Sequence, residues 1–217
     1  MFYKATTAVA LAGLVFTGLP GNSAAAEPPA SPATYDAVEN FAPVFSDYTT
    51  LSGLFTFKLP VGYFVLEKIN EKASAFYLRQ VMDIHIYSPS GQEVAFLAER
   101  YWRDGVGGPF APEQTVLAQA KTANMSYSPG DDIDYRLTYN RYPDFTDITM
   151  RLEDREIGGY GVAAEQFEVA GNGISVFRVN VGKILGDDAS IETVRQWQET
   201  PQYAQLETML TSLRANI

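Results

Sequence analysis

The chain contains one histidine, His85, and no cysteine. His85 stands between Ile84 and Ile86, so on a strand its imidazole would lie on the face opposite these isoleucines. An imidazole can act as a metal ligand or as a general acid or base. Metal sites built from thiolates, or from two histidines of one chain, are excluded by composition. We therefore expect no tightly bound transition metal and no cofactor, and we interpret His85 as a surface residue that at most contributes to a binding surface.

Carboxylates offer a second kind of chemistry. Asp131, Asp132 and Asp134 could bind a hard cation through their oxygens. The segment lacks the glycine and the terminal Glu of a calcium loop, and it follows a Pro-Gly pair, so a solvated turn is the favoured interpretation. Two carboxylates that hydrolyse a glycoside can lie far apart in the chain. A carboxylate-dependent hydrolase therefore stays an alternative, with no residue assigned as catalytic.

Motifs for nucleotides and for nucleophilic catalysis are missing. Gly105-x-Gly107-Gly108 is not followed by the Lys of a P-loop and does not fit the dinucleotide fingerprint. No Gly-x-Ser-x-Gly elbow occurs. Aromatic side chains could line a ligand groove, although aromatics at strand spacing more often form core and cross-strand pairs. With His85, the candidate residues for binding a ligand or partner are Tyr63, Tyr87, Tyr101 and Trp102, and Tyr77 belongs to the same aromatic set.

Composition limits the classes of partner. The chain has 217 residues, 46% of them hydrophobic, a formal net charge of −10 and a pI of about 4.6. Nucleic acids and anionic membrane surfaces are bound through Lys and Arg, so both are poor candidates. The length suits one sizeable domain.

The N-terminus has the pattern of a secretory signal. Lys4 precedes an apolar run at 5–19, and Ala24-Ala25-Ala26 offers small residues to a signal peptidase. We expect cleavage between Ala26 and Glu27, with an uncleaved membrane anchor as the alternative. The run is short for a span, which needs about 20 apolar residues. The mature protein would then have no stable membrane span and would reside in the periplasm, the thylakoid lumen or the extracellular space.

After the predicted signal peptide at 1–26 comes a Pro/Ala linker at 27–34, followed by a single domain at 35–217. The domain opens with a short helix or turn near 35–48. Next, Phe55 and Phe57 alternate with polar residues, which predicts a strand with one buried face.

Pro60 ends that strand, and Gly62 can adopt a positive φ in the turn that follows. Similar alternation predicts strands at about 75–87, 92–102, 133–140, 148–152, 162–169 and 174–185. Helices are predicted at about 112–124, from 191 onward, and from Thr200-Pro201 to about 213. The fold class is therefore α+β, an antiparallel sheet covered by helices.

This arrangement resembles the PsbP-like family, whose members are α/β/α sandwiches related to an extrinsic subunit of the oxygen-evolving complex. The resemblance covers the order of elements over 51–213. It rests on the final helix at 203–213 and on a Phe-x-Phe-x-x-Pro-x-Gly-aromatic start, here Phe55, Phe57, Pro60, Gly62 and Tyr63. The family usually has Trp at the last of these positions. The resemblance implies a binding or assembly-assisting protein without chemistry of its own.

Three functions from different classes follow. The first is an exported, non-catalytic interaction or assembly-assisting protein that binds a protein partner. The second is a carrier of a small apolar molecule or lipid in an aromatic-lined groove. The third is the carboxylate-dependent hydrolase.

Overall fold

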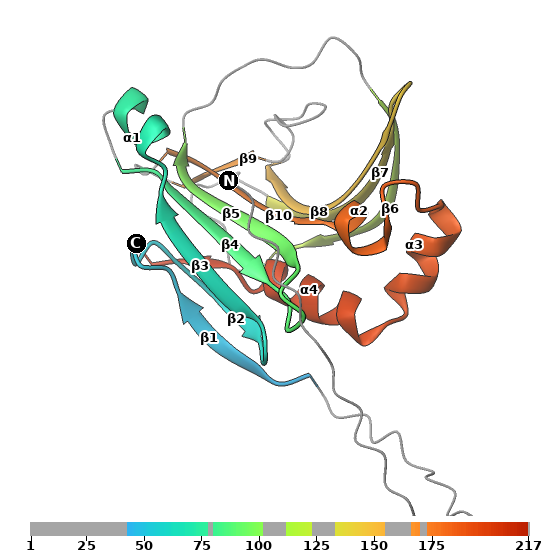
Figure 1. Cartoon of the computed structure of the whole chain (residues 1–217), viewed down its shortest axis with the longest axis horizontal. Helices are drawn as coiled ribbons and strands as arrows, with labels where there is room; N and C mark the ends of the chain where they lie inside the picture. The colour runs from blue at the N-terminus through green and yellow to red at the C-terminus, as the bar shows by residue number, and fades with distance from the viewer. Residues whose placement is uncertain are drawn as a thin grey trace, which may run out of the picture. The chain divides into compact units, whose positions relative to one another are not determined.

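A computed structural model of the chain describes residues 43–77, 80–101, 112–122, 133–154, 166–169 and 173–216. Residues 41–217 form one compact unit that consists mostly of antiparallel sheet, with a few helices (Figure 1). The predicted signal peptide and linker lie outside the described residues. None of the described helices is long and apolar enough to cross a membrane.

Eight strands form the large sheet, seven of them in the order β3-β4-β5-β10-β8-β7-β6. The eighth, β9, lies off this order: it pairs with the first half of β10, and β8 pairs with the second half. The bounds are β3 (Phe64–Ile69), β4 (Met82–Tyr87), β5 (Glu93–Tyr101), β6 (Glu113–Lys121), β7 (Ile133–Arg141), β8 (Thr146–Asp154), β9 (Gln166–Val169) and β10 (Gly173–Asn180).

A second, three-stranded sheet has the order β1-β2-β11. Its strands are β1 (Phe45–Thr49), β2 (Phe55–Pro60) and β11 (Arg214–Ala215). The helices are α1 (Glu71–Tyr77), α2 (Val181–Leu185), α3 (Ile191–Gln198) and α4 (Pro201–Thr211). Ser190 caps α3 and Thr200 caps α4, each accepting a hydrogen bond from a backbone N–H in the first turn.

The hydrophobic core lies between one face of the large sheet and a layer made of β2 and α4. Phe55 packs edge-on against Phe167 with ring centroids 6.1 Å apart, and Phe57 packs against Phe177 at 5.3 Å. Leu206, Met209 and Leu210 of α4 are fully buried in the same core. The predicted packing of the last helix on the sheet is therefore confirmed.

The opening motif is also confirmed as a strand and turn. Phe55 and Phe57 of β2 are buried, while Lys58 is exposed. Gly62 has φ +89° in the turn between β2 and β3, a conformation that favours glycine. The turn after β4 is closed by the N–H of Gly91, which donates to the carbonyl of Ser88.

Several predicted elements were wrong. The helix expected at 112–124 is strand β6, which pairs with β7 over its whole length. Its small and polar residues fit either period, and pairing with a neighbouring strand overrides such a weak local preference. The strand expected at 75–87 is helix α1 followed by β4, and the strand expected at 174–185 ends at Asn180, where α2 begins. Residues 45–49 form β1 rather than a helix or turn.

The predicted class, an antiparallel sheet with helices packed on it, is thus observed. The predicted layering is not observed as stated. Sheet dominates the described residues, and the layer facing the large sheet combines β2 with α4, so the protein is not a pure α/β/α sandwich.

Candidate functional site

The face of the large sheet opposite the hydrophobic core carries mostly polar side chains. One row of cross-strand neighbours crosses it from β4 to β6, and we call the surface around this row the polar face. The row consists of His85, Phe96, Arg178, Arg151, Arg136 and Gln119.

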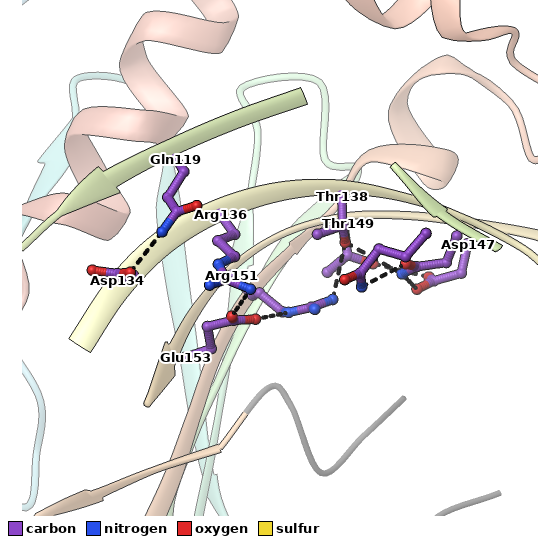
Figure 2. A network of polar contacts seen from close by, with 10 residues as sticks. Gln119, Asp134, Arg136, Thr138, Asp147, Thr149, Arg151 and Glu153 are labelled. Carbon is purple, nitrogen blue, oxygen red and sulfur yellow. Dashed lines mark hydrogen bonds and ion pairs between the residues drawn. The ribbon is translucent and has the colours of Figure 1, made fainter. Parts of the chain in front are cut away.

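Where β7 and β8 form the polar face, its side chains make a buried network of hydrogen bonds and ion pairs (Figure 2). The side chain of Arg151 is 2% exposed; its Nε donates to Oε2 of Glu153 at 3.0 Å, and its Nη1 donates to the hydroxyl of Thr138 at 3.0 Å. Arg136 pairs with the other carboxylate oxygen of Glu153. One buried carboxylate therefore holds two guanidinium groups.

The network continues toward the other end of these strands. Asn140 donates to Thr138 and to Asp147, and the hydroxyl of Thr149 donates to Asp147 (Figure 2). Gln119 of β6 donates to Asp134 at 2.8 Å. Buried polar groups are costly unless they are hydrogen-bonded, so these contacts give this half of the face a structural role.

On the β4 and β5 side, the same face hollows into a pocket of about 220 Å³. Strands β4, β5 and β10 and the start of α2 contribute to it. The described lining residues are His85, Glu93, Val94, Ala95, Phe96, Arg178, Asn180 and Lys183.

Glu93 organises the polar contacts of this pocket. Its Oε2 lies 3.2 Å from Nδ1 of His85, and its Oε1 lies 3.4 Å from Nζ of Lys183. The amide of Gln92 donates to the backbone carbonyl of Lys183, and Asn180 accepts from the backbone N–H of Lys183. These two hydrogen bonds fix the backbone of Lys183, and with it the position from which its side chain extends.

The imidazole of His85 is held on two sides. Its side chain is 17% exposed, and its ring lies 5.2 Å from the ring of Phe96. A carboxylate at Nδ1 places the ring proton on that nitrogen in the neutral form. Nε2 is buried and has no hydrogen-bond partner among the described residues.

A second hollow lies beside the turn between β7 and β8, near Asp144, Asp187 and Asp188. It is acidic and open. In the described part of the chain, no group of three His, Asp or Glu side chains is arranged to hold a metal ion.

The edge of the large sheet next to the pocket is apolar. Among the described strands, β3 ends the strand order and pairs with β4 alone. Phe64 and Leu66 of β3 are 50% and 54% exposed, and we call these two residues the edge patch. Leu66 is the cross-strand neighbour of His85, so the edge patch and the pocket share one face of the sheet.

The sequence-predicted site residues separate onto two faces. Tyr87 stacks on Phe64 with ring centroids 5.0 Å apart, and it shares the polar face with His85. Tyr63 packs partly buried against the core instead, where burial raises the pKa of its phenol and a hydrogen bond from Gln202 offsets part of that rise. The side chain of Tyr101 and all of Trp102 lie outside the described residues, as does the side chain of Tyr77.

Sequence reasoning missed Glu93, Lys183 and Arg178. Glu93 could have been found, because the turn at 88–91 fixes the register that brings it close to His85. Arg178 and Lys183 reach the pocket only because β10 pairs with β5, and that pairing of distant segments leaves no local pattern in the sequence.

A buried carboxyl group lies on the core face of β5. Glu99 is fully buried, and neither of its oxygens has a hydrogen-bond partner of good geometry among the described residues. Burial raises the pKa of Glu99; nearby hydroxyls of Ser52 and Thr50 lower it in part. Next to it, Arg100 has φ +65°, at a bulge where Glu99 and Arg100 together face Ser175 of β10.

We compared the chain with protein-family models, with curated proteins and with solved structures. No significant match was found in any of the three comparisons.

Proposed function

We propose that this chain is an exported, non-catalytic binding protein that receives an extended segment of a protein partner along β3. The observation that carries the proposal is an edge strand whose outward side chains are apolar. Phe64 and Leu66 alternate along β3 and are half exposed.

Natural proteins protect free sheet edges, usually with charges, prolines or bulges. β3 has Lys68 as its one basic residue, while Phe64 and Leu66 occupy the alternate positions that an added strand would contact. A partner segment that adds a strand gains main-chain hydrogen bonds and places every second side chain over the edge patch. The net charge of −10 favours a segment that also carries Lys or Arg.

Two observations weigh against the other functions. The pocket beside the edge patch has a charged lining, which does not suit an apolar or lipid cargo. Its described lining contains one carboxylate, Glu93, whereas glycoside hydrolysis uses two.

The proposal also includes export of the protein and its relationship to the PsbP-like family. The apolar run at 5–19 and the alanines at 24–26 support export to the periplasm, the thylakoid lumen or the extracellular space. The turn at Gly62 and the terminal helix packed on the sheet support a PsbP-like relationship.

The experiment that tests the proposal places a photo-crosslinking side chain at position 66 of the full chain in its native host. Val116 serves as the matched control, because it is 44% exposed on β6, the opposite edge strand of the same sheet. We expect position 66, and not position 116, to crosslink one partner. A peptide covering the crosslinked segment should then slow hydrogen exchange of the β3 amides in the purified protein.

The variant Leu66→Lys should abolish both the crosslink of a probe at position 64 and the exchange protection, with unfolding unchanged. Equal crosslinking from both edges, or a bound peptide that leaves β3 exchange unchanged, would overturn the proposal.

A further inference from the structure

We propose that the segment added along β3 comes from a second copy of this chain. The two β3 strands pair in antiparallel fashion about a two-fold axis at Leu66, so the large sheet continues from one copy into the other. A two-fold contact of this kind uses the same surface on both copies. The inference rests on the proposed function, because it names the partner of the same sheet edge.

The first support is that β3 is complementary to itself in one register. When Leu66 lies opposite Leu66 of the other copy, residues 64–68 of the two strands are paired, and Phe64 lies opposite Lys68. An ammonium group over an aromatic ring is attracted to it. On the other face of the strand, Glu67 lies opposite Val65, so no two like charges meet.

The other two-fold registers fit less well, since each must keep every side chain on its own face of the sheet. Pairing residues 65–69 places Glu67 opposite Glu67, and like charges directly opposite each other destabilise a sheet. Pairing residues 67–69 places Lys68 opposite Lys68. Pairing residues 64–66 leaves half of the strand without a partner. The charges of β3 therefore select the register centred on Leu66.

The second support is the regularity of β3. It pairs with β4 from Phe64 to Ile69 without a register shift, whereas the pairing of β6, the opposite edge strand described for the large sheet, shifts between Val116 and Ala118. A bulge bends an edge strand and protects it from further pairing. A second copy therefore finds a regular strand at β3 and an interrupted one at β6.

The third support is that exposed apolar side chains gather around β3. Val61 lies in the turn before β3, and Phe76 lies on α1 after it. Val44 accepts a hydrogen bond from the N–H of Val61, and the N–H of Leu51 donates to Glu67. Of nine exposed large apolar side chains among the described residues, seven lie on β3 or beside it: Val44, Leu51, Val61, Phe64, Leu66, Ile69 and Phe76.

These side chains extend the contact beyond the paired strands. An antiparallel pair brings the end of one β3, which leads into α1 and Phe76, toward the start of the other β3, which follows Val61. The two-fold axis repeats this meeting at both ends of the pair. Exposed apolar surface of this kind marks protein contacts in soluble proteins.

The chain has no cysteine, so single introduced cysteines report on this contact without background. We expect Leu66→Cys to form a disulfide-linked dimer rapidly on oxidation. Phe64→Cys alone should not, because two copies of position 64 lie four residues apart along the pair, roughly 13 Å, beyond the about 7 Å that a disulfide spans. A mixture of Phe64→Cys and Lys68→Cys should link. Val116→Cys gives the rate of random collision.

Sedimentation equilibrium of the protein recovered from its native host tests association without cysteines. The mass should rise from monomer to dimer with concentration. Leu66→Lys places two ammonium groups opposite each other at the two-fold axis and should weaken the dimer by at least about tenfold. Val116→Lys is the matched control, since it adds the same charge to β6 and should leave the dimer unchanged. At dilutions where the parent is monomeric, unfolding midpoints of both variants should match it.

A parent protein that stays monomeric at every concentration would overturn the inference. So would a disulfide that forms no faster in Leu66→Cys than in Val116→Cys. If a photo-crosslinker at position 66 then captures a different protein in the native host, the proposed function stands and only the second copy is wrong. If it captures nothing, both are wrong.

Discussion

Arg151 and Glu153 lie two residues apart on β8 and form a buried ion pair, with Nε 3.0 Å from Oε2 and side chains 2% and 6% exposed. Arg136 from β7 uses the other oxygen of the same carboxylate. Two guanidinium groups on the polar face therefore depend on one anion.

Glu153→Gln should reduce the free energy of unfolding by about 3–5 kcal/mol, because it removes the carboxylate charge beside the buried guanidinium of Arg151 and beside Arg136, whose side chain is 24% exposed. Urea unfolding at neutral pH measures this. Asp47→Asn is the matched control: Asp47 also holds two cations, Lys58 and Arg214, each at 3.4 Å, but all three side chains are about half exposed. Similar losses from both variants would contradict the structural role of the buried network.

Glu99→Gln should change how stability depends on pH. The pKa of Glu99 in the folded protein is raised above its ordinary value of 4.5, first by burial and in part by the nearby charge of Glu67. An acid whose folded pKa is raised favours folding at low pH, and that contribution is lost as pH rises from the unfolded pKa through the folded one. The parent protein should therefore lose stability relative to Glu99→Gln over this interval.

Urea unfolding of both proteins at several pH values above 4.5 tests the sign. The difference between them should grow with pH and then level off. Glu168→Gln, at an exposed position on β9, should leave the pH dependence unaltered. A parent protein that gains stability over Glu99→Gln as pH rises would refute the assignment.

Leu210→Ala should cost about 2–5 kcal/mol of unfolding free energy, because Leu210 is fully buried where α4 packs on the sheet. Leu66→Ala removes the same atoms from a side chain that is 54% exposed, and it should change stability by less than about 0.5 kcal/mol. Denaturant unfolding of the pair separates core packing from the edge patch. A large loss for Leu66→Ala would mean that β3 is not the free edge described above.

Gly62→Ala should destabilise the turn between β2 and β3 for two reasons. Gly62 has φ +89°, and a Cβ there would lie 3.2 Å from Cγ of Pro89. Gly53→Ala isolates the backbone effect, since Gly53 has φ +74° and a Cβ would meet nothing within 4 Å. We expect a loss of about 1–2 kcal/mol from the backbone in each variant, with a further loss for Gly62→Ala in thermal unfolding.

Mass measurement of the protein recovered from its native host tests the export signal. Signal peptidase cleavage after Ala26 should leave Glu27 as the first residue. A membrane-bound chain that retains its first 26 residues would support the anchor instead.

The sequence pattern predicted most elements whose side chains alternate clearly between apolar and polar. It also predicted elements that begin or end at characteristic capping or turn residues. The alternation of Phe55 and Phe57 with polar residues predicted β2, and Thr200-Pro201 marked the start of α4. β6 was mistaken for a helix because Val116, Leu117 and Ala120 fit both periods, and only pairing with β7 decides between them. His85 was placed on the right face, but its partner Glu93 also contacts Lys183 of α2, which lies 90 residues from Glu93 in the chain and could not be placed from local pattern.

The pairing of β2 with β11 has a consequence for how the protein folds. β2 is the middle strand of the small sheet, and the side chains of Thr56 and Asn216, 160 residues apart, form a hydrogen bond beside that pairing. The chain must close a very long loop before this sheet is complete, which costs entropy and slows folding. We expect the small sheet to form last, so a chain that is still being synthesised or threaded through a membrane pore would leave this sheet incomplete until β11 emerges.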